Sequence, residues 1–242
     1  MSWLRPDFGS GVQALVTNRQ HPKAVEEDEC GGESEFNVAV HAGRQDDVAE
    51  NRVTVTEVLG AHSIQWLNQV HGAEVKYIDE VQSGHLECDA TWTDQKGIGL
   101  AIMTADCVPV LIADDTASVV GAAHAGWQGL EARIVSALIH AMPVAPSRLK
   151  AYVGPAISCE HYEVGADVWE RFPPEFQRPH PMEDKRYLDL VGMVVAELKT
   201  IGVTVVETSG ECCFANAAFY SHRASMQKKR PEGRFVSAIC LL

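Results

Sequence analysis

Three short segments of the chain each place a histidine or a cysteine beside small residues at the end of an apolar run. They read QVHG, TADC and AAHAG, and they carry His71, Cys107 and His124. A side chain at the end of a strand is held by the sheet yet open to solvent, and neighbouring glycine or alanine leaves room for a metal ion or a substrate. The three segments therefore predict an active site built on these residues.

The chemistry that this trio favours is that of zinc. Imidazole nitrogen and thiolate sulfur are common zinc ligands, and catalytic zinc sites often combine three protein ligands with one open position. Zinc in such a site acts as a Lewis acid or activates a water molecule. The ligands are dispersed along the chain without a short diagnostic spacing, so the residues alone leave other chemistries open.

Three alternatives use the same residues differently. Cys107 as a nucleophile with His124 as its base would make a cysteine hydrolase, including an amidase that edits cell-wall precursors. The same ligands can also bind copper, as in a polyphenol oxidase, although multicopper oxidation needs more histidines than these segments supply. A non-catalytic binding module is disfavoured because an open cluster of histidine and cysteine serves no packing purpose.

Composition restricts the class of protein. The 242 residues suffice for one domain with its own core, and the formal net charge of −13 argues against a nucleic-acid partner, which needs clustered lysine and arginine. The sequence offers no apolar run for a membrane span and no signal peptide, so we expect no membrane association and a cytoplasmic location. The seven cysteines lack paired spacing, which indicates thiols in a reducing compartment.

The elements that must position the trio are read from periodicity and from breaking residues. A helix should begin at Asp46 or Asp47 and end at Gly60, and a second should span 130–142 before Pro143. Further helices are expected near 166–172 and 188–200. Strands are expected at 64–67, 74–78, 99–104, 108–113, 118–123, 149–153, 203–206 and 234–239, with Asp114-Asp115 turning a hairpin, and residues 20–35 should form an exposed loop. Hairpins without a regular alternation of strand and helix predict an α+β fold with mixed sheets.

Five ordered motifs carry a resemblance to a known family. They are Asn68–Val75 (NQVHGAEV), Met103–Val110 (MTADCVPV), Ala123–Trp127 (AHAGW), Val153–Ile157 (VGPAI) with Tyr162–Gly165 (YEVG), and Phe219–Arg223 (FYSHR). From about Asp46 to the C-terminus the chain resembles the laccase-domain family, whose members are also described as multicopper polyphenol oxidases or as YfiH-type purine nucleoside phosphorylases.

The resemblance implies a zinc site formed by His71, Cys107 and His124, the trio already singled out. It implies phosphorolysis of adenosine, inosine and methylthioadenosine together with deamination of adenosine, so that purine nucleosides and phosphate are the expected partners. It also implies one catalytic domain over residues 1–242, in which mixed sheets pack face to face between helices as α/β/β/α layers. The sequence does not identify a protein partner.

Phosphorolysis requires a phosphate contact, and the candidates are less distinctive. Arg19 and Arg52 offer planar, bidentate guanidinium groups, with a surface role as the alternative for each. Many relatives have arginine where this chain has Gln128, so we expect a weaker anion contact there. Asp106 could serve as a general acid or base, or as a structural carboxylate that accepts hydrogen bonds from backbone amides.

Overall fold

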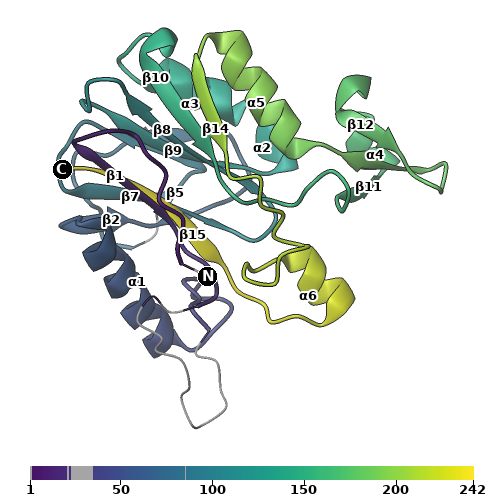
Figure 1. Ribbon diagram of the computed structural model, residues 1–242, viewed down its shortest axis with the longest axis horizontal. Coiled ribbons are helices and arrows are strands. Elements are labelled where there is room, and N and C mark those ends of the chain that lie inside the picture. Colours follow the sequence, from purple (N-terminus) through teal and green to yellow (C-terminus); the bar gives the residue numbers. More distant parts are fainter. Residues whose placement is uncertain (1, 21, 23–34, 85) are drawn as a thin grey trace.

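The computed structural model describes residues 2–20, 22, 35–84 and 86–242, and two large sheets dominate it (Figure 1). The first sheet has four strands, in the order β1 (Val12–Val16), β15 (Phe235–Leu241), β7 (Ile98–Thr104) and β2 (Ser63–Gln65). The second has six, in the order β14 (Val205–Thr208), β10 (Leu149–Val153), β8 (Val108–Asp114), β9 (Val120–Ala125), β6 (Ala90–Thr93) and β4 (Val75–Tyr77). Each sheet contains parallel and antiparallel pairs.

The two sheets pack face to face, because β7 and β15 of the first contact β8 and β9 of the second. The outer face of the six-stranded sheet is covered by α3 (Ile134–Ala141) and α5 (Leu190–Ile201), and α1 (Gln45–Leu59) packs on the four-stranded sheet. Figure 1 shows these helices on opposite sides of the sheets. The predicted α+β fold with α/β/β/α layers is confirmed.

Smaller elements complete the described part of the chain. A three-stranded sheet consists of β11 (Glu163–Gly165), β13 (Lys185–Leu188) and β12 (Gln177–Pro179), and a two-stranded sheet pairs β3 (Leu67–Asn68) with β5 (Leu86–Glu87). The short helices are α2 (Trp127–Glu131), α4 (Ala166–Trp169) and α6 (His222–Lys228), with 3₁₀ turns at Pro146–Arg148 and Pro174–Phe176. None of the helices in the described ranges is long and apolar enough to cross a bilayer.

Several predicted elements are confirmed. Helix α1 ends at Gly60, whose φ of 72° lies in the left-handed region that favours glycine at a helix end. Its start differs from the prediction, since Asp46 and Asp47 lie in the first turn and Arg44 is the residue before the helix. The predicted hairpin joins β8 and β9, because the Asp114 side chain accepts hydrogen bonds from the backbone amides of Ser118 and Val119 within the turn.

Two predictions about local structure need correction. The helix expected over 130–142 is two helices, α2 and α3, because Arg133 between them has a left-handed φ of 63°. Strands β1 and β6 and the three-stranded sheet were not predicted, since their residues lack a clear alternation of apolar and polar side chains. The loop predicted at 20–35 lies outside the described residues except at Gln20, Pro22 and Glu35.

Candidate metal centre

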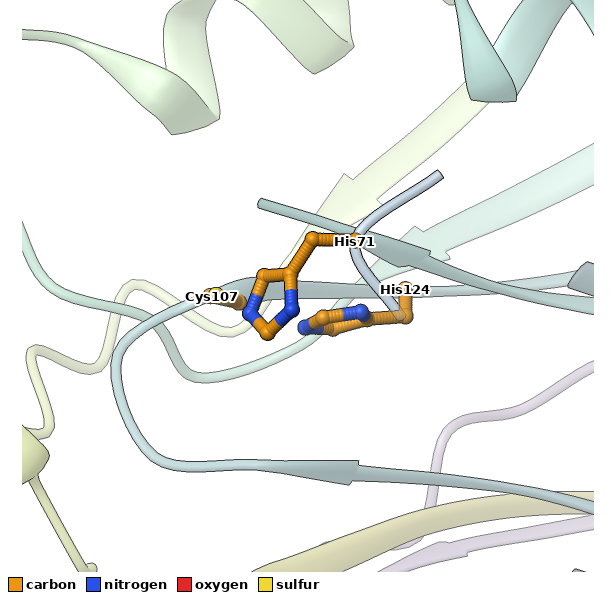
Figure 2. Close-up of side chains that lie close together, drawn as sticks. All are labelled: His71, Cys107 and His124. Carbon is orange, nitrogen blue, oxygen red and sulfur yellow. The ribbon is translucent and has the colours of Figure 1, made fainter. Parts of the chain in front are cut away.

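The three side chains singled out in the sequence converge in space. One ligand atom from each of His71, Cys107 and His124 lies within 4.8 Å of the other two (Figure 2). The two imidazole rings lie edge to face, with ring centroids 4.8 Å apart and an interplanar angle of 76°. The three donors can therefore reach one common metal ion.

Each ligand comes from a different part of the six-stranded sheet or its connections. His71 follows β3 in the connection to β4, Cys107 lies in the turn between β7 and β8, and His124 lies near the end of β9. Strands β8 and β9 are antiparallel, and Pro109 on β8 lies opposite His124 on β9. Cys107 is two residues before Pro109 and lies just outside the paired part of these strands. His71 is exposed, Cys107 is partly buried and His124 is buried.

The backbone at two of these positions is unusual. His71 has a φ of 62° and Asp106, directly before Cys107, has a φ of 105°, both in the left-handed region that non-glycine residues rarely adopt. Such conformations persist where surrounding contacts hold them. They turn the chain sharply at both ligands, so that residues from separate strands face one cavity.

Asp89, which directly precedes β6, hydrogen-bonds to both histidines of the cluster. Its fully buried carboxylate accepts hydrogen bonds from the backbone amides of His71, at 2.9 Å, and Gly72, at 2.7 Å. It also lies 2.8 Å from Nδ1 of His124. With Nδ1–H donated to Asp89, Nε2 of His124 is left to bind a metal, as in many zinc sites where a carboxylate orients a histidine ligand.

Gly126 lies directly against two of the three candidate ligands. A Cβ atom at this position would lie 3.1 Å from Sγ of Cys107 and 3.1 Å from Cδ2 of His71. Any larger residue here would therefore press on two of the three ligands. The glycine in the AHAG sequence is explained by this close approach.

The electrostatics of these three side chains favour the deprotonated thiol. Burial raises the pKa of Cys107, but the charge of His124 and hydrogen bonds with His124 and His71 outweigh burial and leave that pKa below its ordinary value. Burial lowers the pKa of His124, and the opposing effects of Cys107 and Asp89 leave it raised. A thiolate is the form of cysteine that binds metals and acts as a nucleophile.

The cluster opens into a cavity of about 520 Å³. Besides the three ligands, its lining includes Gln69, Tyr162, Arg223 and Arg234. Gln69 joins the loop of His71 to β7, because its side chain donates to the carbonyl of Met103 and accepts from the amide of Met103. A cavity of this size is typical of sites for small organic ligands.

Arg19 and Arg52, the predicted phosphate contacts, are not among the residues that line the cavity. Arg19 forms an ion pair with Glu35 at 2.5 Å and donates to the carbonyl of Ala217. Arg52 donates from Nε to the carbonyl of Val38 and lies over the ring of Trp66, 4.2 Å from its centroid. Neither arginine lines the cavity, and neither does Gln128.

Asp106 does line the cavity, but its carboxylate is engaged by the protein. It accepts hydrogen bonds from Oγ of Ser221, at 2.6 Å, from the backbone amide of Arg223, at 2.6 Å, and from Sγ of Cys213, at 3.2 Å. These bonds favour the structural alternative for Asp106, since they fix the turn that carries Cys107.

Sequence reasoning missed four residues of this site. Tyr162 and Arg223 stood inside the quoted motifs, where their polar groups next to apolar runs were the available signal. Arg234 begins the last predicted strand, and Asp89 is a lone carboxylate between Cys88 and Ala90. A charged residue within an apolar run signals a buried partner, and here that partner is His124.

Comparison with known proteins places this site in a family. The family model described as multi-copper polyphenol oxidoreductase laccase matches residues 14–242. A purine nucleoside phosphorylase of Pseudomonas aeruginosa is 35% identical over 99% of this chain and 98% of its own, and one of Deinococcus radiodurans is 42% identical over 74% of each chain. A Neisseria meningitidis protein of the DUF152 family, known from its crystal structure, has a TM-score of 0.87 at 33% identity and covers 100% of this chain and 99% of its own. The resemblance read from the five motifs is confirmed, and the chain belongs to the multi-copper polyphenol oxidoreductase laccase family.

Proposed function

We propose that this chain is a zinc-dependent purine nucleoside phosphorylase that acts on adenosine, inosine and methylthioadenosine and also deaminates adenosine. The names of the relatives from Pseudomonas aeruginosa and Deinococcus radiodurans support the phosphorylase activity. The observation that carries the metal is the convergence of His71, Cys107 and His124 within 4.8 Å at the cavity. We place the whole activity in one catalytic domain over residues 1–242.

The donor set fits zinc better than a cluster of copper ions. Two imidazoles and one thiolate leave one position of a tetrahedral zinc site open towards the cavity. Asp89 fixes the tautomer of His124, and Gly126 keeps the space beside the other two ligands open. The three residues can equally hold a single copper ion, so copper is the alternative metal.

Two reactions make different demands on this site. Bound zinc supplies a Lewis acid that activates water, which is what attack at C6 of adenine requires. Phosphorolysis instead needs phosphate held against C1′ of the ribose while the purine leaves. The residues of this chain bind and orient the nucleoside for both, since Tyr162 and Gln69 line the same cavity as the metal ligands.

A cysteine-dependent amidase is the second candidate, and one arrangement favours it. In that enzyme the nucleophile would be Cys107 and the base would be His124. The carboxylate that orients the base would be Asp89. The pKa of Cys107, lowered by His124 and His71, is the property that such a nucleophile needs. The two candidates differ in whether the thiolate is bound to a metal during turnover.

Metal analysis of protein purified without added metal tests the proposal. We expect about one zinc ion per chain, lost in His71→Ala, Cys107→Ala and His124→Ala because an open site with two remaining ligands binds zinc weakly. Cys212→Ala removes a partly buried thiol outside the cluster and is the matched control, which should retain zinc. Full zinc content in any two of the three ligand variants would contradict the assignment.

Product analysis tests the reactions. Inosine should give hypoxanthine and ribose 1-phosphate only with phosphate present, whereas adenosine should react with water alone to give inosine and ammonia. Both reactions should disappear in Cys107→Ala. Release of free ribose without phosphate would indicate a nucleoside hydrolase, and no turnover of any purine nucleoside would favour the amidase.

A further inference from the structure

Two arginines and two histidines line the cavity of a protein that is acidic overall. They are Arg223, Arg234, His41 and His222, while the chain carries a formal net charge of −13. The four residues come from three separate segments, so the fold gathers them from distant parts of the sequence. A local concentration of positive charge inside a cavity favours an anionic ligand even when the whole surface repels one.

Both arginines are attached to the turn that carries Cys107. The backbone amide of Arg223 donates to Oδ2 of Asp106 at 2.6 Å. Arg234 directly precedes Phe235, which pairs with Thr104 across β15 and β7. The backbones of both arginines are therefore positioned by residues that shortly precede Cys107, and both side chains line the same cavity as the candidate metal ligands.

Both guanidinium groups have donors left for a ligand. Arg223 donates from Nη1 to the carbonyl of Glu163 at 3.0 Å, lies over the ring of Tyr162 and forms no ion pair with a carboxylate of the described residues. Arg234 donates from Nη1 to the carbonyl of Gly233 at 2.8 Å. A guanidinium carries five N–H donors, so these contacts orient each group and use only part of its capacity.

Two acidic groups, Asp106 and Glu232, lie near these residues. Asp106 is engaged by Ser221, Cys213 and the backbone of Arg223. Glu232 is half-exposed and lies 3.6 Å from Nδ1 of His222 and 3.9 Å from Nη1 of Arg234, longer than a strong charge-assisted hydrogen bond.

We propose that Arg223 and Arg234, with His41 and His222 at their sides, form the subsite that binds inorganic phosphate as the co-substrate. This inference rests on the proposed phosphorylase function and names the phosphate contacts within that cavity. Two guanidinium groups bind a tetrahedral oxyanion through paired, charge-assisted hydrogen bonds. The subsite replaces Arg19 and Arg52 as phosphate contacts, because those two arginines lie outside the cavity lining.

The test measures phosphate binding directly and phosphate dependence separately. Calorimetry with inorganic phosphate at low ionic strength should show one site per chain in the zinc-loaded protein. Arg223→Gln and Arg234→Gln should each weaken that binding at least about tenfold, the loss expected for one charge-assisted hydrogen bond. Arg133→Gln removes an exposed arginine that is not part of the cavity lining and is the matched control. Arg223→Lys and Arg234→Lys, which keep the charge, should recover part of the affinity.

Initial rates with inosine separate this inference from the proposed function. We expect the phosphate KM to rise at least about tenfold in both glutamine variants, with the inosine KM within about threefold and the zinc content unchanged. Phosphorolysis with an unchanged phosphate KM in both variants would overturn the subsite while the function stands. Saturable phosphate binding that both variants lose, in a protein without phosphorolysis, would support the anion site and overturn the function. Absence of phosphate binding in the wild-type protein would overturn the subsite.

Discussion

The carboxylate of Asp89 lies 2.8 Å from Nδ1 of His124, and neither side chain is appreciably exposed. Burial raises the pKa of Asp89, but the hydrogen bonds from His124 and the amide of Gly72 outweigh burial and leave it lowered, so the carboxylate is charged at neutral pH. One buried anion therefore orients His124 on β9 and, through the amides of residues 70–72, the loop that carries His71, the second candidate ligand.

The first prediction concerns this pair. Asp89→Asn should lower zinc affinity by about 10-fold to 100-fold, the range found when the carboxylate behind a histidine ligand is changed. Competition with a zinc chelator of known affinity measures the change. Asp94→Asn alters an exposed carboxylate that bonds to Tyr77 and should leave zinc affinity as it is. Equal affinities of the Asp89 and Asp94 variants would show that Asp89 does not position the ligand.

Gly126→Ala is expected to disturb the ligands without unfolding the protein. The φ of Gly126 is −77°, which alanine adopts readily, but the added Cβ would lie 3.1 Å from both Cys107 and His71. We expect zinc affinity to fall about tenfold or more, since ligand distances tolerate only about 0.2 Å. Thermal unfolding and metal titration of the same sample separate the two effects.

Gly210→Ala is the control, because it strains the backbone without crowding any side chain. Gly210 has a φ of 69° and no atom within 4 Å of its added Cβ, so alanine there is strained but touches nothing. Its stability should fall by about 1–2 kcal/mol while zinc affinity stays unchanged. A zinc affinity of Gly126→Ala equal to that of wild type would show that the ligands have room to move.

The third prediction concerns acid stability. Burial raises the pKa of Asp114, but hydrogen bonds from Thr116, Val119 and Ser118 outweigh burial and lower it to about 2. Because the pKa is lower in the folded state, the stabilisation is present above about pH 4, the ordinary value for aspartate, and is lost as the pH falls towards 2. It amounts to about 2 kcal/mol.

Urea unfolding of wild type and Asp114→Asn between pH 2 and pH 6 measures this contribution. The difference in the free energy of unfolding should be largest above pH 4 and should shrink as the pH falls. Asp115→Asn is the neighbouring control, since Asp115 is half-exposed and bonds only to Arg148 among the described side chains. A difference that does not vary with pH would assign the depressed pKa to another carboxylate.

The sequence predicted those parts of the fold and site that depend on local chemistry. Gly60 ends α1 because glycine tolerates a left-handed φ, and the turn of β8 and β9 follows from the capping carboxylate of Asp114. The convergence of His71, Cys107 and His124 could be predicted because donor residues stood beside small residues in apolar runs. The break at Arg133 could not, since arginine is a good helix former and nothing nearby signals a left-handed residue.

The remaining site residues depend on strand register and topology, which local patterns do not reveal. Asp89 reaches His124 because Ala90 pairs with Ala123 across β6 and β9. Arg234 reaches the cavity because β15 pairs with β7, and these strands are more than 100 residues apart in the sequence. Arg19 and Arg52 were chosen for the chemistry of guanidinium alone, and the fold directs them to other partners.

The last prediction separates a zinc enzyme from a cysteine hydrolase through the reactivity of Cys107. If zinc occupies the thiolate, iodoacetamide should modify Cys107 slowly, and removal of the metal by a chelator should raise the rate at least about tenfold because the free thiolate is the reactive form. The six thiols of the described chain include buried Cys88 and Cys240, whose pKa values are raised by burial, so they serve as unreactive internal controls in peptide mapping. Nucleoside turnover should disappear with the metal and return when zinc is added before alkylation. Rapid modification of the metal-loaded protein, with full turnover after chelation, would assign Cys107 as the nucleophile.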